Sequence, residues 1–238
     1  MSKPIVPPPA PRISPRLSTE IVSAARTAAA GTRTDFKSLL ASSLSESRHD
    51  PHAHNKRSSA AGAFQFTERT WLDLVRRHGA ALGHGDAAAK ITVTDGKPSV
   101  TDPADRAAIL ALRTDSSFAG ALAARYSDEN RVALGKHLGR KVNENEVRIA
   151  YLLGASGAGR LLRAAHDHPG IGVDKIVPGA VRSNPGLFRR PNGTAKTAGE
   201  AVAALERHFD GEMRQIKSAV TRLSAAEPAI VPVDDDVA

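Results

Sequence analysis

The stretch from Asp35 to Asp73 constrains the fold more than any other part of this 238-residue chain. It opens with an amphipathic segment, DFKSLLASSLSES, in which apolar residues recur at helical spacing. The segment runs into Asp50-Pro51, where the residue before proline is steered away from helical angles. A polar loop, Gly62 and a second amphipathic segment, TERTWLDLVRRHG, follow. The sequence therefore predicts two helices joined by a polar loop, with the end of the first helix facing a cleft.

Glu46 is the candidate catalytic group of this stretch. It lies in the last turn of the first helix, at the edge of the apolar stripe. Partial burial and the negative end of the helix dipole both disfavour a carboxylate, so both raise the pKa of Glu46. A glycosidase general acid needs a carboxyl group that is still protonated near the working pH. The alternative, from position alone, is an exposed glutamate that is solvated or paired with Arg48.

Several loop residues are suited to hydrogen-bonding a sugar. Ser58 and Ser59 are small and polar, and Gly62 allows close approach of backbone to a ligand. Gln65 offers both a donor and an acceptor, which match a hydroxyl or acetamido group. Ordinary loop chemistry explains the serines nearly as well. We expect Phe66 and the single tryptophan, Trp71, to pack in the core.

Three histidines, His49, His52 and His54, crowd the same loop. Clustered histidines can bind zinc, but the chain has no cysteine, and Pro51 restricts the loop geometry. We interpret them as part of a solvated loop, and we expect no metal and no cofactor.

The rest of the chain reads as mainly α-helical with one small β-hairpin. The sequence ITVTDGKPSV predicts the hairpin, with Asp95-Gly96 at its turn. Asp102-Pro103 and Asn143, with Glu146 three residues later, are helix-start patterns. Expected helices cover 18–31, 35–47, 67–79, 103–114, 116–126, 131–139, 146–154, 160–168 and 197–224.

Composition divides the chain into a folded part and two tails. Residues 1–17 are Pro-rich and basic, residues 18–224 form the domain, and residues 225–238 are acidic; we expect both tails to be disordered. The net charge of +8 attracts polyanions. No nucleic-acid-binding motif accompanies it, so we expect no specific nucleic-acid partner. The start of the chain lacks the apolar core of a secretory signal, and no apolar run reaches the ~20 residues of a membrane span.

Three short motifs, in this order along the chain, resemble the signatures of the soluble lytic transglycosylase family of the lysozyme superfamily. Glu46-Ser47 matches the family's ES, the Gly62–Phe66 element matches GLMQ, and Ala150-Tyr151 with Gly154 matches AYNAG. The wider match runs over 35–209 and looks like the branch found in alphaproteobacteria. Three separated motifs in one order form a specific signal.

The chain departs from the family pattern at two places. Ala63-Phe64 stand where the family has Leu-Met, and Leu152-Leu153 stand where it has Asn-Ala. The second change removes an asparagine, and with it any substrate contact that this residue makes in the family.

The resemblance implies a lysozyme-like helical fold and a peptidoglycan lytic transglycosylase. Glu46 would act as a single acid and base, and Tyr151 would hydrogen-bond to it and orient it. The cleaved bond would be the β-1,4 link between N-acetylmuramic acid and N-acetylglucosamine, with a 1,6-anhydro product and no water consumed. The residues expected to contact substrate are Ser47, Ser59, Gly62, Phe64, Gln65 and Ala150.

Two other functions stay open. A hydrolytic muramidase on the same fold needs a second acid, for which Glu68 and Asp73 are the candidates. A catalytically weak wall-binding or assembly scaffold would act through the basic tail and the long last helix. In each case the expected partners are peptidoglycan glycan strands, with a flagellum or secretion system as a possible envelope-spanning machine. The expected location is the periplasm or cell envelope, and the expected state is a monomer.

Overall fold

A computed structural model describes residues 17–55 and 58–226. Within these ranges the protein is mainly α-helical, with eleven α-helices and one two-stranded antiparallel hairpin, which confirms the predicted class at this level. The α-helices are α1 (Thr19–Ala29), α2 (Phe36–Ser47), α3 (Glu68–His78), α4 (Gly85–Ala89), α5 (Pro103–Ala111), α6 (Ser116–Leu138), α7 (Glu144–Asp167), α8 (Val173–Ile176), α9 (Pro178–Ser183), α10 (Pro185–Phe188) and α11 (Ala198–Ala226). The strands are β1 (Thr92–Thr94) and β2 (Lys97–Ser99), and short 3-10 turns cover Ala80–Leu82 and Leu112–Thr114.

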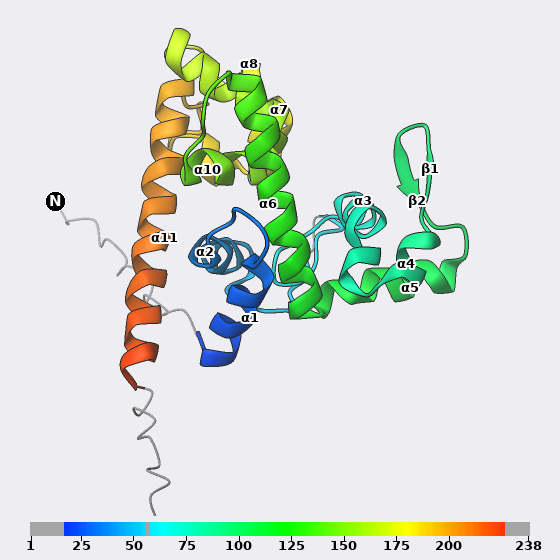
Figure 1. The fold of residues 1–238 in the computed structure, drawn as a ribbon. Coiled ribbons are helices and arrows are strands. Elements are labelled where there is room, and N and C mark those ends of the chain that lie inside the picture. Colours follow the sequence, from blue (N-terminus) through cyan, green and yellow to red (C-terminus); the bar gives the residue numbers. More distant parts are fainter. Residues whose placement is uncertain (1–16, 56–57, 227–238) are drawn as a thin grey trace, which may run out of the picture.

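The three longest helices frame the molecule (Figure 1). Helix α6 packs along α7, and α11 packs against both α7 and α2. Helix α1 lies against α2 and α6. Helices α3, α4 and α5 and the hairpin project to one side, away from α11 (Figure 1). Helix α2, which carries Glu46, is therefore held between the first and last helices of the described residues.

Local sequence determines where most helices begin. The side chains of Asp35, Thr67 and Asp102 each accept a hydrogen bond from the first turn of α2, α3 and α5. Asn143 and Glu146 form both hydrogen bonds of a capping box at the start of α7. These caps satisfy backbone N–H groups that have no partner inside the helix, which fixes the helix starts. The predicted starts are confirmed at these positions.

The prediction of two helices over 116–139 is wrong, because α6 is continuous from Ser116 to Leu138. The polar run around residues 127–130 is typical of a new helix start. In the structure Ser127 and Asn130 are buried. Tertiary packing of α6 against α7 thus overrides the local preference of these residues for a helix terminus. The predicted loops over 80–90 and 168–196 also contain short helical turns, including α4, α8, α9 and α10.

Helix α7 bends sharply at Gly154. This residue has φ 70° and ψ 155°, inside what is otherwise a helical run. Farther along α7, an added Cβ on Gly159 would lie 3.3 Å from the Cβ of His137, so this glycine allows close packing on α6. The sequence predicts two helical segments here, over 146–154 and 160–168, and the bend at Gly154 lies at the end of the first. Tyr151 lies one turn before it.

Three groups of buried side chains form the core. One surrounds Trp71, which is 0% exposed and donates from Nε1 to the carbonyl oxygen of Ile109 at 2.8 Å. Phe66 is in the same group, so both residues are core residues, as predicted. A second group packs α7 against α11 and the short helices α8–α10. The third group joins α1, α2 and α11, and Leu17 packs against its edge.

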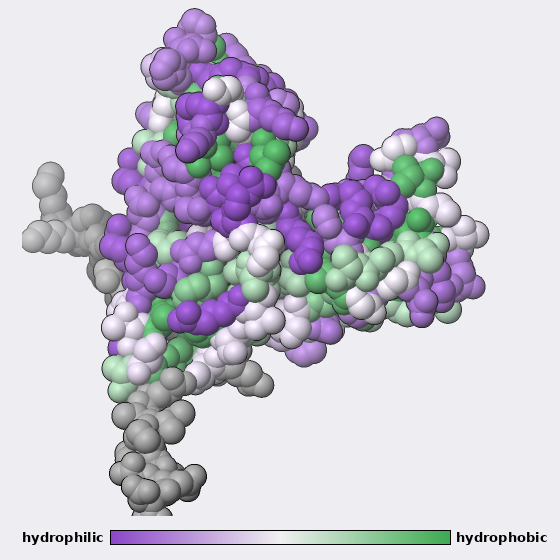
Figure 2. Space-filling model, in the orientation of Figure 1, coloured by the Kyte–Doolittle hydropathy of each residue, from purple (hydrophilic) through white to green (hydrophobic). Residues whose placement is uncertain are grey.

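The two tails fall almost wholly outside the described residues. Of the expected N-terminal tail, 1–17, only Leu17 is described, and 225–226 belong to α11. Most of the face in Figure 2 is hydrophilic, with apolar side chains gathered over α5 and over the lower parts of α1 and α11. No helix in the described ranges is both long and apolar enough to cross a membrane.

Candidate active site

Glu46 lies in the last turn of α2, and the helix ends in two left-handed residues. Arg48 has φ 58° and His49 has φ 67°. Their backbone N–H groups donate to carbonyl groups of the last helical turn, at 3.0 and 3.2 Å. Left-handed angles are uncommon for residues other than glycine. The helix therefore ends before Pro51, as predicted, through a strained turn directly after Glu46.

Glu46 lines a groove of about 750 Å³. The loop after α2, the start of α3, the middle of α6 and α7, and the α9–α10 junction all contribute walls. Among the described lining residues, only Glu46 and Arg182 carry a formal charge. The others are neutral polar, aromatic or small: Asn55, Ser58, Phe64, Gln65, Phe66, Thr67, Thr70, Tyr126, Tyr151, Leu152, Gly154, Ser183, Asn184 and Pro185.

The pKa of Glu46 is raised from its ordinary value of 4.5 to about 7. Burial of the partly exposed side chain is the main cause, and the negative charge of Glu212 adds to it. The positive charge of Arg148 acts in the opposite direction. The shift has the direction predicted from the position of Glu46. A carboxyl group with this pKa can give up a proton and take one back near neutral pH.

Arg148, Glu212 and His208 form a charged network beside Glu46. Arg148 on α7 and Glu212 on α11 are almost fully buried and form an ion pair with each other. Nε2 of His208 lies 3.1 Å from Oε1 of Glu212, and this hydrogen bond raises the pKa of His208. Arg148 and His208 line a second cavity, of about 140 Å³, which shares Glu46, Tyr151, Leu152 and Asn184 with the groove. The network therefore places both signs of charge beside Glu46.

Tyr151 lies in the groove with Glu46, on the α7 wall. Its hydroxyl donates to the carbonyl oxygen of Phe64 at 3.4 Å, and its ring packs edge-on to Tyr126 with centroids 5.1 Å apart. Burial, and next the charge of Glu46, raise the pKa of Tyr151 well above 10. The tyrosine is thus a neutral donor at pH 7. The hydrogen bond that the resemblance implies between Tyr151 and Glu46 is not found among the described residues, and the orienting role of Tyr151 stays a prediction.

Phe64 and Gln65 also line the groove. Gln65 has a left-handed backbone, with φ 48°. Its Nε2 donates to the carbonyl oxygens of Ala53 at 3.2 Å and Gly62 at 2.9 Å. The amide nitrogen therefore holds the loop together.

The other residues expected to contact substrate hold the fold around the groove. Ser47 Oγ donates to the carbonyl oxygen of Ala63 at 2.8 Å, and Ser59 Oγ accepts from the backbone N–H of Glu68 at 3.2 Å. Ala150 is fully buried. The two serine side chains thus bond to protein groups, and none of the three residues is among the described lining residues of the groove.

Gly62 is buried with φ 81°, and a Cβ added to it would lie 2.2 Å from the carbonyl oxygen of Arg113. The close approach predicted at this glycine is therefore to protein backbone. Gly62 sets the position of the loop that carries Phe64 and Gln65.

The two candidate second acids lie on α3 in surface ion pairs. Glu68 pairs with Arg106 at 2.5 Å, and Asp73 pairs with Arg76 and Arg77 at 3.0 Å each. Neither is part of the groove lining. Over 17–55 and 58–226 there is also no group of three or more His, Cys, Asp or Glu side chains that could hold a metal ion. In the described part of the groove, Glu46 is the one carboxyl group.

A scan against models of known protein families finds no match for this chain.

Sequence reasoning missed the charged network and the α9–α10 wall. A signal for the network was present, because Leu205, Phe209, Glu212 and Ile216 follow one another at helical spacing. A charged residue among the apolar residues of one helix face is buried together with them, and a buried charge needs an oppositely charged or hydrogen-bonding partner. The partner, Arg148, is distant in sequence, so the spacing alone could not identify it.

Proposed function

We propose that this chain is a peptidoglycan lytic transglycosylase of the soluble lytic transglycosylase family, with a lysozyme-like fold. One observation carries the proposal: a partly buried carboxyl group, Glu46, has its pKa raised to about 7 in a groove with no other carboxyl group among its described lining residues. The order of the motifs supports the same assignment. Glu46, Phe64-Gln65 and Tyr151 come from separate elements and line one groove.

The reaction needs one group that is an acid first and a base afterwards. Protonated Glu46 gives its proton to the oxygen between N-acetylmuramic acid and N-acetylglucosamine, and the bond from that oxygen to C1 of the muramic acid breaks. The acetamido group of the same sugar stabilises the positive charge that develops at C1, as in substrate-assisted glycosidases. The Glu46 carboxylate then takes the proton of the C6 hydroxyl, and O6 bonds to C1. Glu46 ends protonated, and no water is consumed.

Mass spectrometry of products released from purified sacculi tests the proposal. We expect 1,6-anhydro-muropeptides from the wild-type protein. Glu46→Gln cannot transfer a proton, so its rate should fall by about 100-fold or more, since general acid–base catalysis contributes on the order of 10²–10⁴. Asp73→Asn is the matched control, because Asp73 lies on α3 outside the groove and should keep full activity. Unchanged lysis by Glu46→Gln would remove the basis of the proposal.

The hydrolytic alternative is favoured by one feature, the polar cavity beside Glu46. This cavity is lined by Ser42, Ser45, Arg148, Asn184 and His208 as well as apolar residues, and its groups suit bound water. Water at that position could attack C1 in place of O6. Products with reducing ends that take up ¹⁸O from labelled water would identify a muramidase.

The substrate implies that the protein works in the periplasm or cell envelope. A flagellum or secretion system that crosses the wall is the kind of assembly that such an enzyme would serve. The scaffold alternative differs in its outcome, because it requires binding to sacculi with no released product from either the wild type or Glu46→Gln.

A further inference from the structure

Most polar side chains that line the groove around Glu46 already bond to other groups of the protein. The residues with such bonds include Ser58, Gln65, Thr67, Thr70, Tyr126, Tyr151 and Asn184. Among the described lining residues, the polar side chains without a hydrogen bond or ion pair are Glu46, Arg182 and Ser183. These three keep their full hydrogen-bonding capacity for a ligand.

Arg182 lies in α9 and is exposed, and Ser183 follows it at the end of that helix. The next two arginines along the chain are used by the fold. Arg189 donates to a backbone carbonyl group at 2.7 Å, and Arg190 forms an ion pair with Glu200. Arg182 has neither kind of contact with a described residue. A guanidinium without a counter-ion in a groove is suited to a carboxylate, which it can bind through two parallel hydrogen bonds.

The surroundings of Arg182 are positively charged. Residues 173–196, which include the α9–α10 side of the groove, contain five Lys or Arg and one Asp. Residues 67–105, which include the α3 side, contain five Lys or Arg and six Asp or Glu. The positive charge of the chain is therefore uneven, and its field favours an anionic group on the α9–α10 side of the groove.

Arg182 lies at a different place in the groove from Glu46. The charges that shift the pKa of Glu46 are those of Glu212 and Arg148, and Arg182 is not among them. Asn184, two residues after Arg182, lines both the groove and the small cavity beside Glu46. The chain thus runs from Arg182 toward Glu46, so one extended ligand can contact both.

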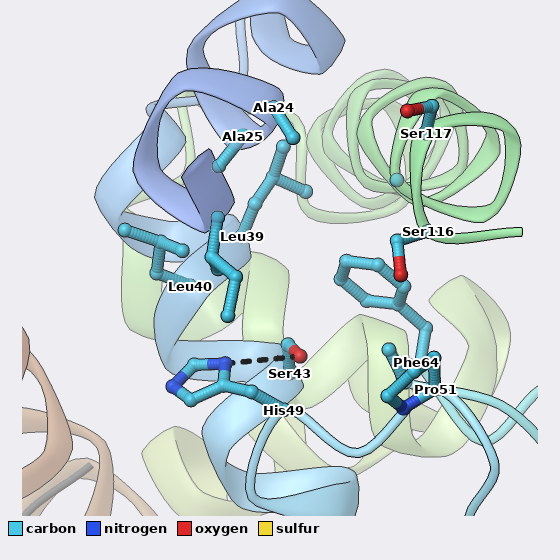
Figure 3. A pocket seen from close by; sticks show the side chains of 13 residues that line it. Ala24, Ala25, Leu39, Leu40, Ser43, His49, Pro51, Phe64, Ser116 and Ser117 are labelled. Atoms are coloured by element: carbon cyan, nitrogen blue, oxygen red, sulfur yellow. Dashed lines mark hydrogen bonds between the residues drawn. The ribbon is translucent and has the colours of Figure 1, made fainter. Parts of the chain in front are cut away.

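The cavity between α1, α2 and the first turn of α6 offers no such charge (Figure 3). It has a volume of about 320 Å³, and its walls are mostly aliphatic. Its titratable lining residue, His49, has Nδ1 3.1 Å from Ser43 Oγ (Figure 3). Burial lowers the pKa of His49 to about 4, so the ring is neutral at pH 7. Of these two spaces, the groove is the one suited to a carboxylate.

We propose that Arg182 determines specificity by binding a carboxylate of the glycan, so that the groove takes an acidic muramyl glycan in preference to a neutral one. The inference rests on the proposed function, which places a sugar bond at Glu46. Muramic acid differs from glucosamine by a lactyl ether that ends in a carboxyl group. In a strand with stem peptides this group is an amide, and the peptides supply the carboxylates. The group that Arg182 binds is a carboxylate in both cases.

Calorimetric titration of the full chain with three tetrasaccharides tests the inference. Chitotetraose is neutral, a muramyl tetrasaccharide without peptides carries lactyl carboxylates, and the same tetrasaccharide with stem peptides carries only peptide carboxylates. The parent protein for these titrations is Glu46→Gln, so that no probe is cleaved. We expect an acidic probe to bind about tenfold more tightly than chitotetraose, because hydrogen bonds to charged groups contribute at least this much. The acidic probe with the larger gain identifies the source of the carboxylate.

Changes at Arg182 in the same background separate recognition from net charge. Arg182→Gln should bind the acidic probes no more tightly than chitotetraose, with its affinity for chitotetraose unchanged. Arg182→Lys keeps the charge but loses the planar pair of donors, so it should keep part of the gain. Lys175→Gln is the control, since Lys175 is exposed on α8, has no partner among the described residues and is not among the described lining residues. It should bind all three probes as the parent does.

The kinetics of the chain with Glu46 intact give a second readout. Arg182→Gln should raise KM for soluble glycan strands by about tenfold and leave kcat nearly unchanged. The reason is that a carboxylate away from the reacting bond is bound equally in the ground state and the transition state. A lower kcat with an unchanged KM would place Arg182 in the chemical step and contradict a role in specificity.

Three binding results would overturn the inference. These are equal affinity of the parent for neutral and acidic probes, an unchanged acidic preference in Arg182→Gln, or an equal loss of that preference in Lys175→Gln. A wild type that releases 1,6-anhydro-muropeptides but gives one of these results contradicts the inference alone. A wild type that releases no product, while its Glu46→Gln form prefers acidic glycans through Arg182, contradicts the proposed reaction and leaves the role of Arg182 in place.

Discussion

Glu46 lies next to a buried ion pair, which the Glu212 carboxylate forms with the Arg148 guanidinium. Glu212 raises the pKa of Glu46 and Arg148 lowers it, and burial is the larger effect. Because Arg148 and Glu212 form one buried ion pair, the effect of replacing either residue depends on what happens to the other. The protonation of Glu46 is thus a property of the group of three side chains.

Glu46→Gln should change how stability depends on pH. The pKa of Glu46 in the folded protein, about 7, lies above its ordinary value of 4.5. Stability from the protonated form is therefore fully present below pH 4.5 and is lost as the pH rises to about 7. Relative to Glu46→Gln, the wild type should lose roughly 2–3 kcal/mol between pH 4.5 and 8, after allowance for solvent screening. Urea unfolding of both proteins across this range measures the difference, and parallel curves would contradict the raised pKa.

Single changes in the buried ion pair should shift the pH–rate profile in opposite directions. Arg148→Met leaves the Glu212 charge unopposed, so the pKa of Glu46 rises and the alkaline limb moves to higher pH. Glu212→Gln removes that charge, so the limb moves to lower pH. Each change also leaves a buried charge without its partner, at a cost of about 3–5 kcal/mol.

The double variant, Arg148→Met with Glu212→Gln, should recover most of the lost stability, because it removes both of the fully buried charges and leaves only the half-exposed His208 without its carboxylate partner. Glu206→Gln, on the same helix as Glu212, is the control for loss of one carboxylate. If both single variants moved the alkaline limb in the same direction, the network would not be acting on Glu46 through charge.

The direction of the Glu46 shift could be predicted from sequence because its cause is local. Its place at the edge of an apolar stripe implies burial, and burial is the main cause in the structure. The contribution of Glu212 could not be predicted, since it depends on how α11 packs against α2 and α7. The roles of Ser47 and Ser59 were also beyond sequence reasoning. A hydroxyl in a loop can bond to protein or to ligand, and only the fold decides which.

The bend in α7 is the element-scale feature that shapes the groove. Gly154 lines the groove and has φ 70° and ψ 155°, a combination that side chains with a Cβ rarely adopt. The bend turns the second half of α7 away from Tyr151 and Leu152, which form the α7 wall of the groove. Both segments pack on α6, through Tyr151 before the bend and Gly159 after it, and the segment before the bend carries the groove wall.

Gly154→Ala should therefore cost stability and activity together. No atom lies within 4 Å of an added Cβ, so the cost arises from backbone strain alone. We expect a loss of about 1–3 kcal/mol and a lower lytic rate, because a relaxed helix displaces the Tyr151 wall. Gly179→Ala is the matched control, since Gly179 lies inside α9 with equal space around it. That change should be neutral or stabilise by up to about 1 kcal/mol. Equal effects of the two changes on the free energy of unfolding would exclude strain at Gly154.

Element starts were easier to predict than element lengths. A cap such as Asp102 with Pro103 is complete within a few residues, so its meaning does not depend on distant packing. The length of α6 depends on Ser127 and Asn130, which are polar yet buried. The residues next to Ser127 and Asn130 in sequence do not distinguish this buried segment from the start of a helix. For this reason the sequence predicts a break where α6 is continuous.

For the whole molecule, the proposed function predicts that the net charge of +8 contributes to binding of the anionic cell wall. Salt screens such attraction, because the Debye length falls from about 10 Å at 0.1 M to about 3 Å at 1 M. Binding of the protein to purified sacculi should therefore weaken by about tenfold between 50 and 500 mM salt. Glu46→Gln should bind and respond to salt like the wild type. Cosedimentation measures both, and salt-independent binding would show that contacts within the groove dominate.

The class of the whole molecule could be predicted, but its assembly could not. Helical periodicity, caps and the Asp95-Gly96 hairpin suffice for a mainly α-helical protein with one hairpin. The packing of α11 on α2 joins residues from opposite ends of the chain. Such pairings depend on the shapes of complete helices, which no short motif encodes.

That pairing has a consequence for the order in which the protein is made. Glu46 leaves the ribosome early, whereas Glu212, whose charge helps to raise the pKa of Glu46, belongs to α11 and emerges more than 160 residues later. Until that helix docks, the end of α2 lacks both its apolar cover and its charged neighbour. A chain still being synthesised therefore carries Glu46 without the surroundings that raise its pKa, and this carboxyl group reaches its folded-state pKa only after α11 has emerged and docked.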